Sequence, residues 1–362
     1  MTASVNRRTP NDQSDEVPPD HPLTTKEGWR AFVELDPAPP ELLPDGELAA
    51  LHRNTRAKYN RVRMGYHSEL PLVSTPAIRK AAATARLLLQ LNKHQISARR
   101  GGIISGYSGT GKTTALTYLG RAHELAVRKQ HPEQGRRLPV VYVTVPPAAT
   151  PKMLAVEFAR FFGLSFVARA NITDIVDAVC ATASHVGVDL VLVDELHNLT
   201  AARSGAEASD QLKYFAERLR ATFVYAGIDI ESNGLFSGVR GRQLAGRFTL
   251  IPTQAFDYAT EQEIADWHTL VATMESMLRL HQHEKGALPD LGEYLFERTG
   301  GMIGSLSQLI RGAAILAIED GSEQITRDLL DIVPIDYAAE LAARKRAAAK
   351  KTRSGTTSKK AA

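Results

Sequence analysis

The sequence predicts an α/β fold in which a parallel sheet lies between two layers of helices, followed by a small all-helical domain. Short apolar segments alternate with segments of helical spacing between residues 99 and 258, as in a parallel sheet covered by helices. One of these segments, residues 188–193, is almost continuously apolar, which is typical of a strand buried on both faces. From Thr260 onward the strand pattern disappears, and glycines separate helical segments.

The first apolar segment leads into a glycine-rich loop. Residues 102–105 precede the sequence GYSGTGKTT at 106–114, and helical spacing follows. A phosphate-binding P-loop requires this order of strand, loop and helix, because the glycines let successive N–H groups point at phosphate oxygens. We therefore expect a nucleoside triphosphate, ATP, to be bound by Gly106, Ser108, Gly109, Thr110, Gly111, Lys112, Thr113 and Thr114.

Two side chains of this loop have more specific expected roles. Lys112 is expected to bridge the β- and γ-phosphates of the nucleotide. Thr113 is expected to offer its hydroxyl to Mg²⁺. The predicted cofactors are therefore ATP and Mg²⁺.

A pair of carboxylates ends the apolar segment 188–193. Asp194 and Glu195 are adjacent, and two charges at the end of a buried strand are costly unless a cation lies near them. We expect Asp194 to complete the Mg²⁺ site, mostly through water, and Glu195 to polarise the attacking water. Glu195 therefore indicates that the nucleotide is hydrolysed.

The remaining elements follow in chain order. Residues 1–20 are polar and predict disorder, and the prolines of residues 36–45 predict a linker or extended arm. Helical spacing begins near Gly46, and Ser74-Thr75-Pro76 reads as the cap and first turn of a helix. Further strands are predicted at 139–145, 222–226 and 248–252, and the helices of the last domain at 261–284, 289–298, 303–319 and 324–332.

Composition restricts the class of protein. The chain has 362 residues, enough for a nucleotide-binding core, an accessory domain and tails. Its apolar runs are of strand length, and residues 1–20 lack the apolar core of a secretory signal. The single cysteine, Cys180, excludes an intrachain disulfide framework, and its apolar helical setting predicts a core position. We expect a cytoplasmic protein without membrane contact.

Positive charge is concentrated in two places. The net charge is +4, but residues 341–362 carry eight basic residues and no acid, which leaves 36 basic and 40 acidic residues elsewhere. The second cluster is the predicted helix at 53–63, since no acid occurs from His52 to His67. Both clusters are candidates for phosphate contacts with DNA. The helix could equally be a solvated face or a subunit contact, and the tail could contact an acidic partner.

Three stretches resemble one family. They are DELHNL at 194–199, Arg99-Arg100 leading into the P-loop strand, and the upstream pair GYH at 65–67 and STPA at 74–77. Together they resemble the TniB-type AAA+ ATPases of bacterial transposons, which are relatives of TnsC and, more distantly, of MuB and the IstB/DnaC group. The P-loop and the carboxylate pair are generic, whereas the upstream segment and Asp-Glu-x-His-Asn are more specific. The resemblance covers residues 50–335, approximately.

This resemblance implies a P-loop AAA+ core followed by a helical lid. It also implies ATP-dependent assembly on double-stranded DNA as a homo-oligomer, in a ring or a helical filament, and the delivery of target DNA to a transposase, with a TniQ-like targeting protein as a further partner. Two alternatives remain open: a helicase-loader-like ATPase whose partner is a replicative helicase, and a signalling or defence NTPase switch that binds no DNA.

On this basis the chain is divided into five parts. Each part is assigned from the composition and periodicity described above, together with the resemblance. They are an extended N-terminal arm (1–45), a helical N-terminal segment (46–98), the AAA+ core (99–258), the helical lid (259–335) and a basic C-terminal tail (336–362).

The resemblance also places an arginine that acts on the nucleotide of a neighbouring subunit. Arg240, Arg242 and Arg247 precede the last strand, where this arginine is usually found, and Arg247 resembles the family pattern best. Arg247 is therefore the expected catalytic residue in trans, beside Glu195 and Lys112.

The two sensor positions depart from the family pattern. Relatives usually have a small polar residue after Gly227 at sensor 1, where this chain has Ile228, and Asp229 is the candidate substitute. Sensor 2 lacks its arginine, because the turn at Gly300-Gly301 is followed by Gly-Ser-Leu at 304–306. Either Arg311 compensates, or turnover is slow, as in a switch.

His197 and Asn198 follow the carboxylate pair. No second metal-ligand cluster accompanies His197, so the sequence does not favour a metal site there. We expect the two side chains to form hydrogen bonds near the sensor 1 strand and to couple the nucleotide state to neighbouring elements.

Overall fold

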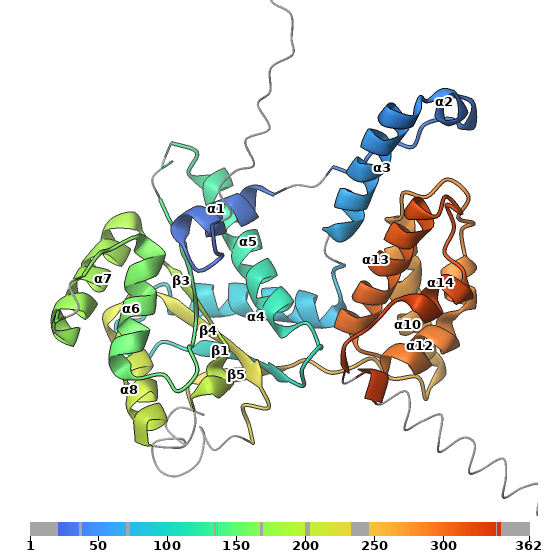
Figure 1. Ribbon diagram of the computed structural model, residues 1–362. Coiled ribbons are helices and arrows are strands. Elements are labelled where there is room, and N and C mark those ends of the chain that lie inside the picture. Colours follow the sequence, from blue (N-terminus) through green and yellow to red (C-terminus); the bar gives the residue numbers. More distant parts are fainter. Residues whose placement is uncertain are drawn as a thin grey trace, which may run out of the picture.

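The computed structural model describes residues 21–35, 38–69, 73–133, 135, 137–166, 169–199, 203–232, 246–337 and 339–341, with the backbone alone at 203–208. These residues form a lobe built on a sheet and a lobe built only of helices (Figure 1). We refer to them as the sheet lobe and the helical lobe. Each has its own hydrophobic core, one around the strands and the other around Trp267 and α13 (Ile303–Glu319).

The sheet contains five parallel strands among the described residues, in the order β2-β3-β4-β1-β5. Their bounds are β1 (Gly101–Gly106), β2 (Val140–Thr144), β3 (Leu190–Asp194), β4 (Thr222–Ile228) and β5 (Phe248–Pro252). Gly106 pairs with Ile228, and Thr144 with Asp194, so these strands end together. The carboxyl ends of β1, β3 and β4 therefore meet at one edge of the sheet.

Helices cover both faces of the sheet, which confirms the expected α/β class with three layers. On one side α4 (Pro76–Asn92) packs against α5 (Lys112–Gln130) and against β1, while α5 also contacts β3 and β4. The other layer consists of α6, α7 and α8, which contact one another (Figure 1). Their bounds are α6 (Pro151–Phe162), α7 (Ile172–Val186) and α8 (Arg203–Arg218). As expected, Thr75 caps α4 and Pro76 occupies its first turn.

The sequence predicted an extended arm at residues 1–45, and this prediction is wrong for residues 26–34. These residues form helix α1 (Lys26–Glu34), which begins at the Thr25 cap and buries Trp29 and Val33. Both side chains lie on one face of a helix, because they are four residues apart. The nearby prolines hid this short amphipathic pattern, and packing against α5 stabilises the helix.

The segment at 46–98 does not form one unit. It comprises α2 (Asp45–Ala50), α3 (Arg53–Ser68) and α4. Helix α3 packs against α13 of the helical lobe, whereas α4 belongs to the sheet lobe. A stretch that is continuous in sequence is thus shared between the two lobes.

The helical lobe follows β5. It consists of α10 (Glu261–Ser276), α11 (Ala287–Asp290), α12 (Gly292–Thr299), α13 and α14 (Arg327–Ile332). Thr260 and Glu263 form a capping box at the start of α10. No single described helix is long and apolar enough to cross a membrane; α12 and α13 reach that length only together, across a bend of 117°.

A buried ion pair joins α3 to the helical lobe. The Arg63 guanidinium donates two hydrogen bonds to the Glu323 carboxylate, at 2.6 and 2.7 Å, and the Arg63 side chain is fully buried. Nearby, the Arg279 backbone N–H donates to His67 Nε2, and Arg311 donates to the carbonyls of His67 and Ser68. Arg63, which belongs to the basic helix that we considered for DNA contact, is thus a structural residue.

We expect Arg63→Ala to lower the free energy of unfolding by about 3–5 kcal/mol, because it leaves the Glu323 carboxylate buried without its partner. Arg61→Ala is the matched control, since Arg61 is exposed two residues earlier on the same helix and should change stability by less than about 0.5 kcal/mol. Denaturant unfolding of both variants measures the difference, and equal stability would contradict this role of the ion pair.

His67 predicts a loss of stability at acidic pH. Burial, with smaller effects of Arg63 and Arg279, lowers the pKa of His67 to about 4, although the Arg279 N–H and Glu323 oppose this shift. The folded protein therefore keeps His67 neutral while the unfolded chain takes up a proton below about pH 6.5. Stability from this residue is complete above that pH and falls between about 6.5 and 4, by at most about 3 kcal/mol. The midpoint of thermal unfolding against pH should show this decline, and His67→Gln should flatten it.

Candidate nucleotide-binding site

The glycine loop joins β1 to the first turn of α5 at the carboxyl edge of the sheet. Gly109 and Gly111 have φ values of 80° and 82°, which other residues rarely adopt. A Cβ on Gly106 would lie 2.0 Å from the Thr253 carbonyl oxygen, so no side chain fits there. The loop thus presents the N-terminus of a 19-residue helix, with its unpaired N–H groups, to the edge of the sheet.

Lys112 is the first residue of α5, at the end of this loop. Its Nζ donates to the Tyr107 carbonyl at 2.6 Å, and Thr110 Oγ1 donates to the same carbonyl at 2.8 Å. Burial lowers the pKa of Lys112, while the charges of Asp194, Glu195 and Asp229 act in the opposite direction. The ammonium group is thus within electrostatic range of the carboxylates that follow β3 and β4.

The other residues expected to bind nucleotide differ in exposure. Ser108, Gly109 and Thr113 are exposed, whereas Thr110 is buried and shares a hydrogen bond with Thr253 Oγ1 at 2.9 Å. Thr253 follows β5 and was not foreseen from the sequence, because its place beside the loop depends on the pairing of β5 with β1. Thr114 is half-buried and faces a cavity.

That cavity lies between the loop, α4 and the helical lobe, and has a volume of about 310 Å³. Its lining is mostly apolar and comes from the P-loop and from the four helices α4, α5, α10 and α13, with the residues next to them. The residues are Val73, Thr75, Ala77, Ile78, Thr110, Gly111, Thr114, Ala115, Met274, Met277, Ile303, Gly304, Ser307, Ile310 and Arg311. An apolar cavity next to a phosphate-binding loop has the character of a site for a nucleotide base. The STPA segment was noted in the sequence, but its position as a wall of this cavity was not.

The helical lobe touches the P-loop directly. The Gly304 N–H donates to the Gly109 carbonyl at 3.1 Å, so the first turn of α13 is tied to the loop. This is the region where sensor 2 was expected. Arg311 lines the same cavity, but its guanidinium is bonded to the carbonyl groups at the end of α3.

Asp194 is held by two hydrogen bonds at the end of β3. Its Oδ1 accepts from the Glu195 backbone N–H at 2.8 Å, and its Oδ2 accepts from the Tyr142 hydroxyl at 3.1 Å. The Asp194 residue is only 3% exposed. Burial, with the neighbouring Asp194 charge, raises the pKa of Tyr142, so its hydroxyl stays protonated and donates. Nothing in the sequence singled out Tyr142, because it lies within an apolar strand.

Glu195 turns away from the sheet. Its φ of 58° is in the left-handed region, which is unusual for a residue with a side chain and is often found at functional sites. The Glu195 side chain is 45% exposed, and its Oε2 lies 3.2 Å from His197 Nε2. The carboxylate is thus accessible, and an imidazole orients it.

His197 and Asn198 form hydrogen bonds at the ends of neighbouring strands, and that of His197 is near the sensor 1 strand, as expected. They lie on the short helix η1 (Leu196–Asn198). The Ile228 N–H donates to His197 Nδ1 at 3.4 Å, and Asn198 Nδ2 donates to the carbonyl of Val145 at 2.8 Å. Since Nδ1 accepts this hydrogen bond, Nε2 is the ring nitrogen that can donate to Glu195. Glu195 is thereby linked to the end of β4.

The two residues that depart from the family pattern at sensor 1, Ile228 and Asp229, lie at the end of β4. Asp229 has a φ of 43° and acts electrostatically on Lys112. The Ile230 N–H donates to Ser105 Oγ at 3.0 Å, and Ser105 donates to Glu231. Carboxylates of this turn thus lie on the side of the sheet where the P-loop begins, and Glu231 was not foreseen from the sequence.

Arg247 lies at the amino ends of β1 and β5, whereas the P-loop lies at the carboxyl end of β1. It directly precedes β5, its carbonyl accepts from the Gly101 N–H, and its guanidinium is 3.5 Å from Glu217. The structure therefore does not bring Arg247 to the P-loop of its own chain. Arg240 and Arg242 lie outside the described residues.

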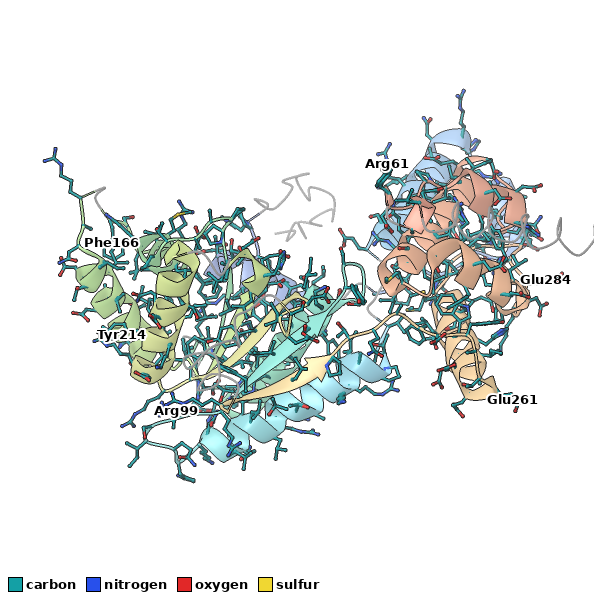
Figure 2. All side chains as sticks on the ribbon, turned by 90° about the horizontal axis from the view of Figure 1, so that it is seen from below. Arg61, Arg99, Phe166, Tyr214, Glu261 and Glu284 are labelled. Atoms are coloured by element: carbon teal, nitrogen blue, oxygen red, sulfur yellow. The ribbon has the colours of Figure 1, made fainter. Side chains whose placement is uncertain are left out.

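The structure describes the basic residues of α3 that were considered for DNA contact. Arg53, Arg56, Lys58 and Arg61 are exposed on α3, and Arg61 is labelled on the helical lobe in Figure 2. The basic residues at 344–360 lie outside the described residues.

Fold and site together define a P-loop protein with an AAA+-type fold. The Aeropyrum pernix ORC2 protein, in its ADPNP–ADP complexes, has a similar fold with a TM-score of 0.56 and 18% sequence identity, over 73% of this chain and 66% of that chain. The ORC1 protein of the same organism, in complex with DNA, gives a TM-score of 0.54 and 15% identity, over 76% of this chain and 66% of that chain. The chain thus spans slightly less than two thirds of the length of either protein.

The family model of the bacterial TniB protein matches residues 63–258, more than half of the chain. The protein belongs to the TniB family, which confirms the resemblance noted in the sequence. A comparison with curated proteins finds no match.

We expect His197→Ala to lower the rate of ATP hydrolysis about tenfold while nucleotide affinity changes less than about twofold, because Glu195 loses the group that orients it. His185→Ala is the control, since His185 is an exposed histidine at the end of α7. Steady-state hydrolysis and equilibrium nucleotide binding separate the two effects. A loss of binding equal to the loss of rate would show that His197 supports the loop instead.

Proposed function

We propose that this protein binds ATP with Mg²⁺, assembles on double-stranded DNA in the ATP-bound form, and recruits or activates a transposase there. Hydrolysis of ATP ends or reorganises the assembly. The observation that carries the proposal is that the loop with Lys112 and the pair Asp194-Glu195 follow neighbouring strands at the same edge of the sheet, with the helical lobe bonded to the same loop.

Different groups bind the phosphates, bind the base and orient the attacking water. The loop N–H groups and Lys112 hold the phosphates, and the cavity between α4 and α13 holds the base. Glu195 orients the attacking water, and His197 orients Glu195.

The residues present fit a Mg²⁺ ion. Asp194 and the Thr113 hydroxyl supply oxygen ligands, and Mg²⁺ is usually held by one or two protein groups together with phosphates and water. Among the described residues, no group of three or more His, Cys, Asp and Glu side chains is placed to hold a metal ion, so the phosphates would supply the remaining ligands. When bound, the ion neutralises charge on the phosphate oxygens.

Assembly would complete the site. Arg247 lies at the edge of the sheet remote from its own P-loop, so it would reach the phosphates of a neighbouring subunit in a ring or a helical filament. Its ion pair with Glu217 would open when the neighbour binds.

DNA contact would come from the exposed basic face of α3 and from the basic tail. Arg53, Arg56, Lys58 and Arg61 project from one helix, and such clusters bind phosphates without regard to sequence. The similar ORC1 protein is in complex with DNA. Membership of the TniB family supports a transposase as partner, a TniQ-like protein as a further partner, and a cytoplasmic location.

The test is binding of labelled duplex DNA with ATP, with ADP and without nucleotide, at several salt concentrations. We expect ATP-dependent binding that weakens with salt, and Lys112→Ala should abolish both ATP binding and the ATP-dependent part. Lys58→Ala should reduce the slope of log affinity against log salt by about one if Lys58 contacts a phosphate. Lys129→Ala is the matched control, since Lys129 is exposed on α5 of the other lobe.

Absence of ATP-dependent DNA binding would overturn the transposition function and favour a signalling or defence switch. Unchanged ATP binding by Lys112→Ala would overturn the nucleotide site itself. Stimulation of a replicative helicase, with no effect on a transposase, would favour the helicase-loader alternative.

A further inference from the structure

Helix α1 has no part in the site described so far, yet it reaches the residue that holds Asp194. Tyr142 lies on β2, beside β3, and its register partner is Leu192. Asp194 is two residues beyond Leu192, so its side chain lies on the same face of the sheet as Tyr142. This placement allows the Tyr142 hydroxyl to donate to Asp194 Oδ2.

The ring of Tyr142 is backed by a side chain of α1. Trp29 stacks on Tyr142 with ring centroids 6.0 Å apart and an interplanar angle of 11°. Trp29 is fully buried, and its indole N–H donates to Glu124 Oε2 at 2.6 Å. Glu124 is itself buried and is held by Arg128, one turn further along α5. Hydrogen bonding thus fixes the edge of the indole, and its face supports the tyrosine.

Gly120 of α5 leaves room for this arrangement. A Cβ on Gly120 would lie 2.7 Å from Trp29 Cη2 and 2.5 Å from Leu192 Cδ1. The Trp29 ring therefore lies close against the backbone of α5 and the side chains of β3. An indole in such a tight space cannot turn without displacing its neighbours.

Helix α1 is also fastened at both ends. Arg121 of α5 donates to the carbonyls of Val33 and Leu35, at 3.1 and 2.7 Å. Lys26 donates to the Phe162 carbonyl at the end of α6, at 3.1 Å. Helix α1 thus connects α5 and α6 (Figure 1). Trp29 lies between these two attachments along the helix.

We propose that Tyr142 is a positioning residue for Asp194, and that α1 acts through Trp29 to keep Tyr142 in place. Asp194 has one oxygen fixed by its own strand end and the other by Tyr142, so the carboxylate has a single orientation. Partners of this kind orient the groups that bind a metal ion and raise its affinity. The inference rests on the proposed function in one respect, namely that Asp194 contributes to binding Mg²⁺.

The experiment compares Tyr142→Phe with Tyr225→Phe. Both variants remove one hydroxyl from a buried tyrosine of the sheet, but Tyr225 on β4 is the register partner of Val193, so its side chain lies on the opposite face of the sheet from Asp194. A fluorescent ATP analogue is titrated in EDTA and then at increasing Mg²⁺. We expect Tyr142→Phe to raise the half-saturating Mg²⁺ concentration about tenfold while the affinity in EDTA stays within twofold, and Tyr225→Phe to change neither.

The role of α1 is tested by Trp29→Phe, with Trp267→Phe as its control. Trp29 and Trp267 are the only tryptophans of the chain, both are fully buried, and Trp267 belongs to the helical lobe. Trp29→Phe keeps an aromatic ring but loses the bond to Glu124, so we expect half-saturating Mg²⁺ to rise by a few-fold, with Trp267→Phe unchanged. Thermal unfolding confirms that each variant is folded under the binding conditions.

The outcomes are distinct. Equal Mg²⁺ dependence of Tyr142→Phe and Tyr225→Phe would overturn the role of Tyr142, as would an equal loss of affinity in EDTA and in Mg²⁺. A normal Trp29→Phe beside an altered Tyr142→Phe would overturn the part of α1. If wild type and Lys112→Ala bind the analogue equally, the proposed nucleotide site fails instead, whatever the tyrosine variants show.

Discussion

Because β1, β4 and β3 run parallel and in register, the glycine loop and the two carboxylates emerge at the same edge of the sheet. Gly106 pairs with Ile228, and Val193 with Tyr225, so the site spans three neighbouring strands. Asp194 and Glu195 would repel each other at this edge without a cation, and Lys112 faces them from the loop. The electrostatics of the site thus depends on the pairing of strands that are distant in sequence.

The sheet lobe and the helical lobe also meet at the glycine loop. Gly304 of α13 is bonded to Gly109 of the loop, and the cavity beside the loop takes its walls from α4, α10 and α13. A ligand in this cavity would contact both lobes and would therefore favour one relative arrangement of them. Helix α3 is joined to the helical lobe by the buried pair of Arg63 and Glu323, so the basic face of α3 would move together with that lobe. This connection would link the proposed nucleotide site to the surface proposed to bind DNA.

Much of the fold and the centre of the site could be predicted from the sequence. The apolar run at 188–193 predicted a central strand because such a strand is buried on both faces, and β3 indeed lies between β2 and β4. The prediction of an extended arm was wrong for α1. A helix of nine residues is stable only through tertiary packing, here that of Trp29 on α5 and β2, and no local sequence pattern shows this packing. Likewise the basic run on α3 gave no sign that Arg63 is buried, because its partner, Glu323, is 260 residues away.

By itself, the sequence determined the class of chemistry. The loop at 106–114 and the pair Asp194-Glu195 are each contiguous, so their residue types and spacing are sufficient to indicate a nucleotide and its hydrolysis. Only the tertiary structure decided what surrounds them: Tyr142 on Asp194, Trp29 behind Tyr142, His197 between Glu195 and β4, and the helical lobe on the loop. These contacts join residues that are far apart in the chain or on different strands. They depend on register and close packing, which fix where side chains meet and which the local sequence does not encode.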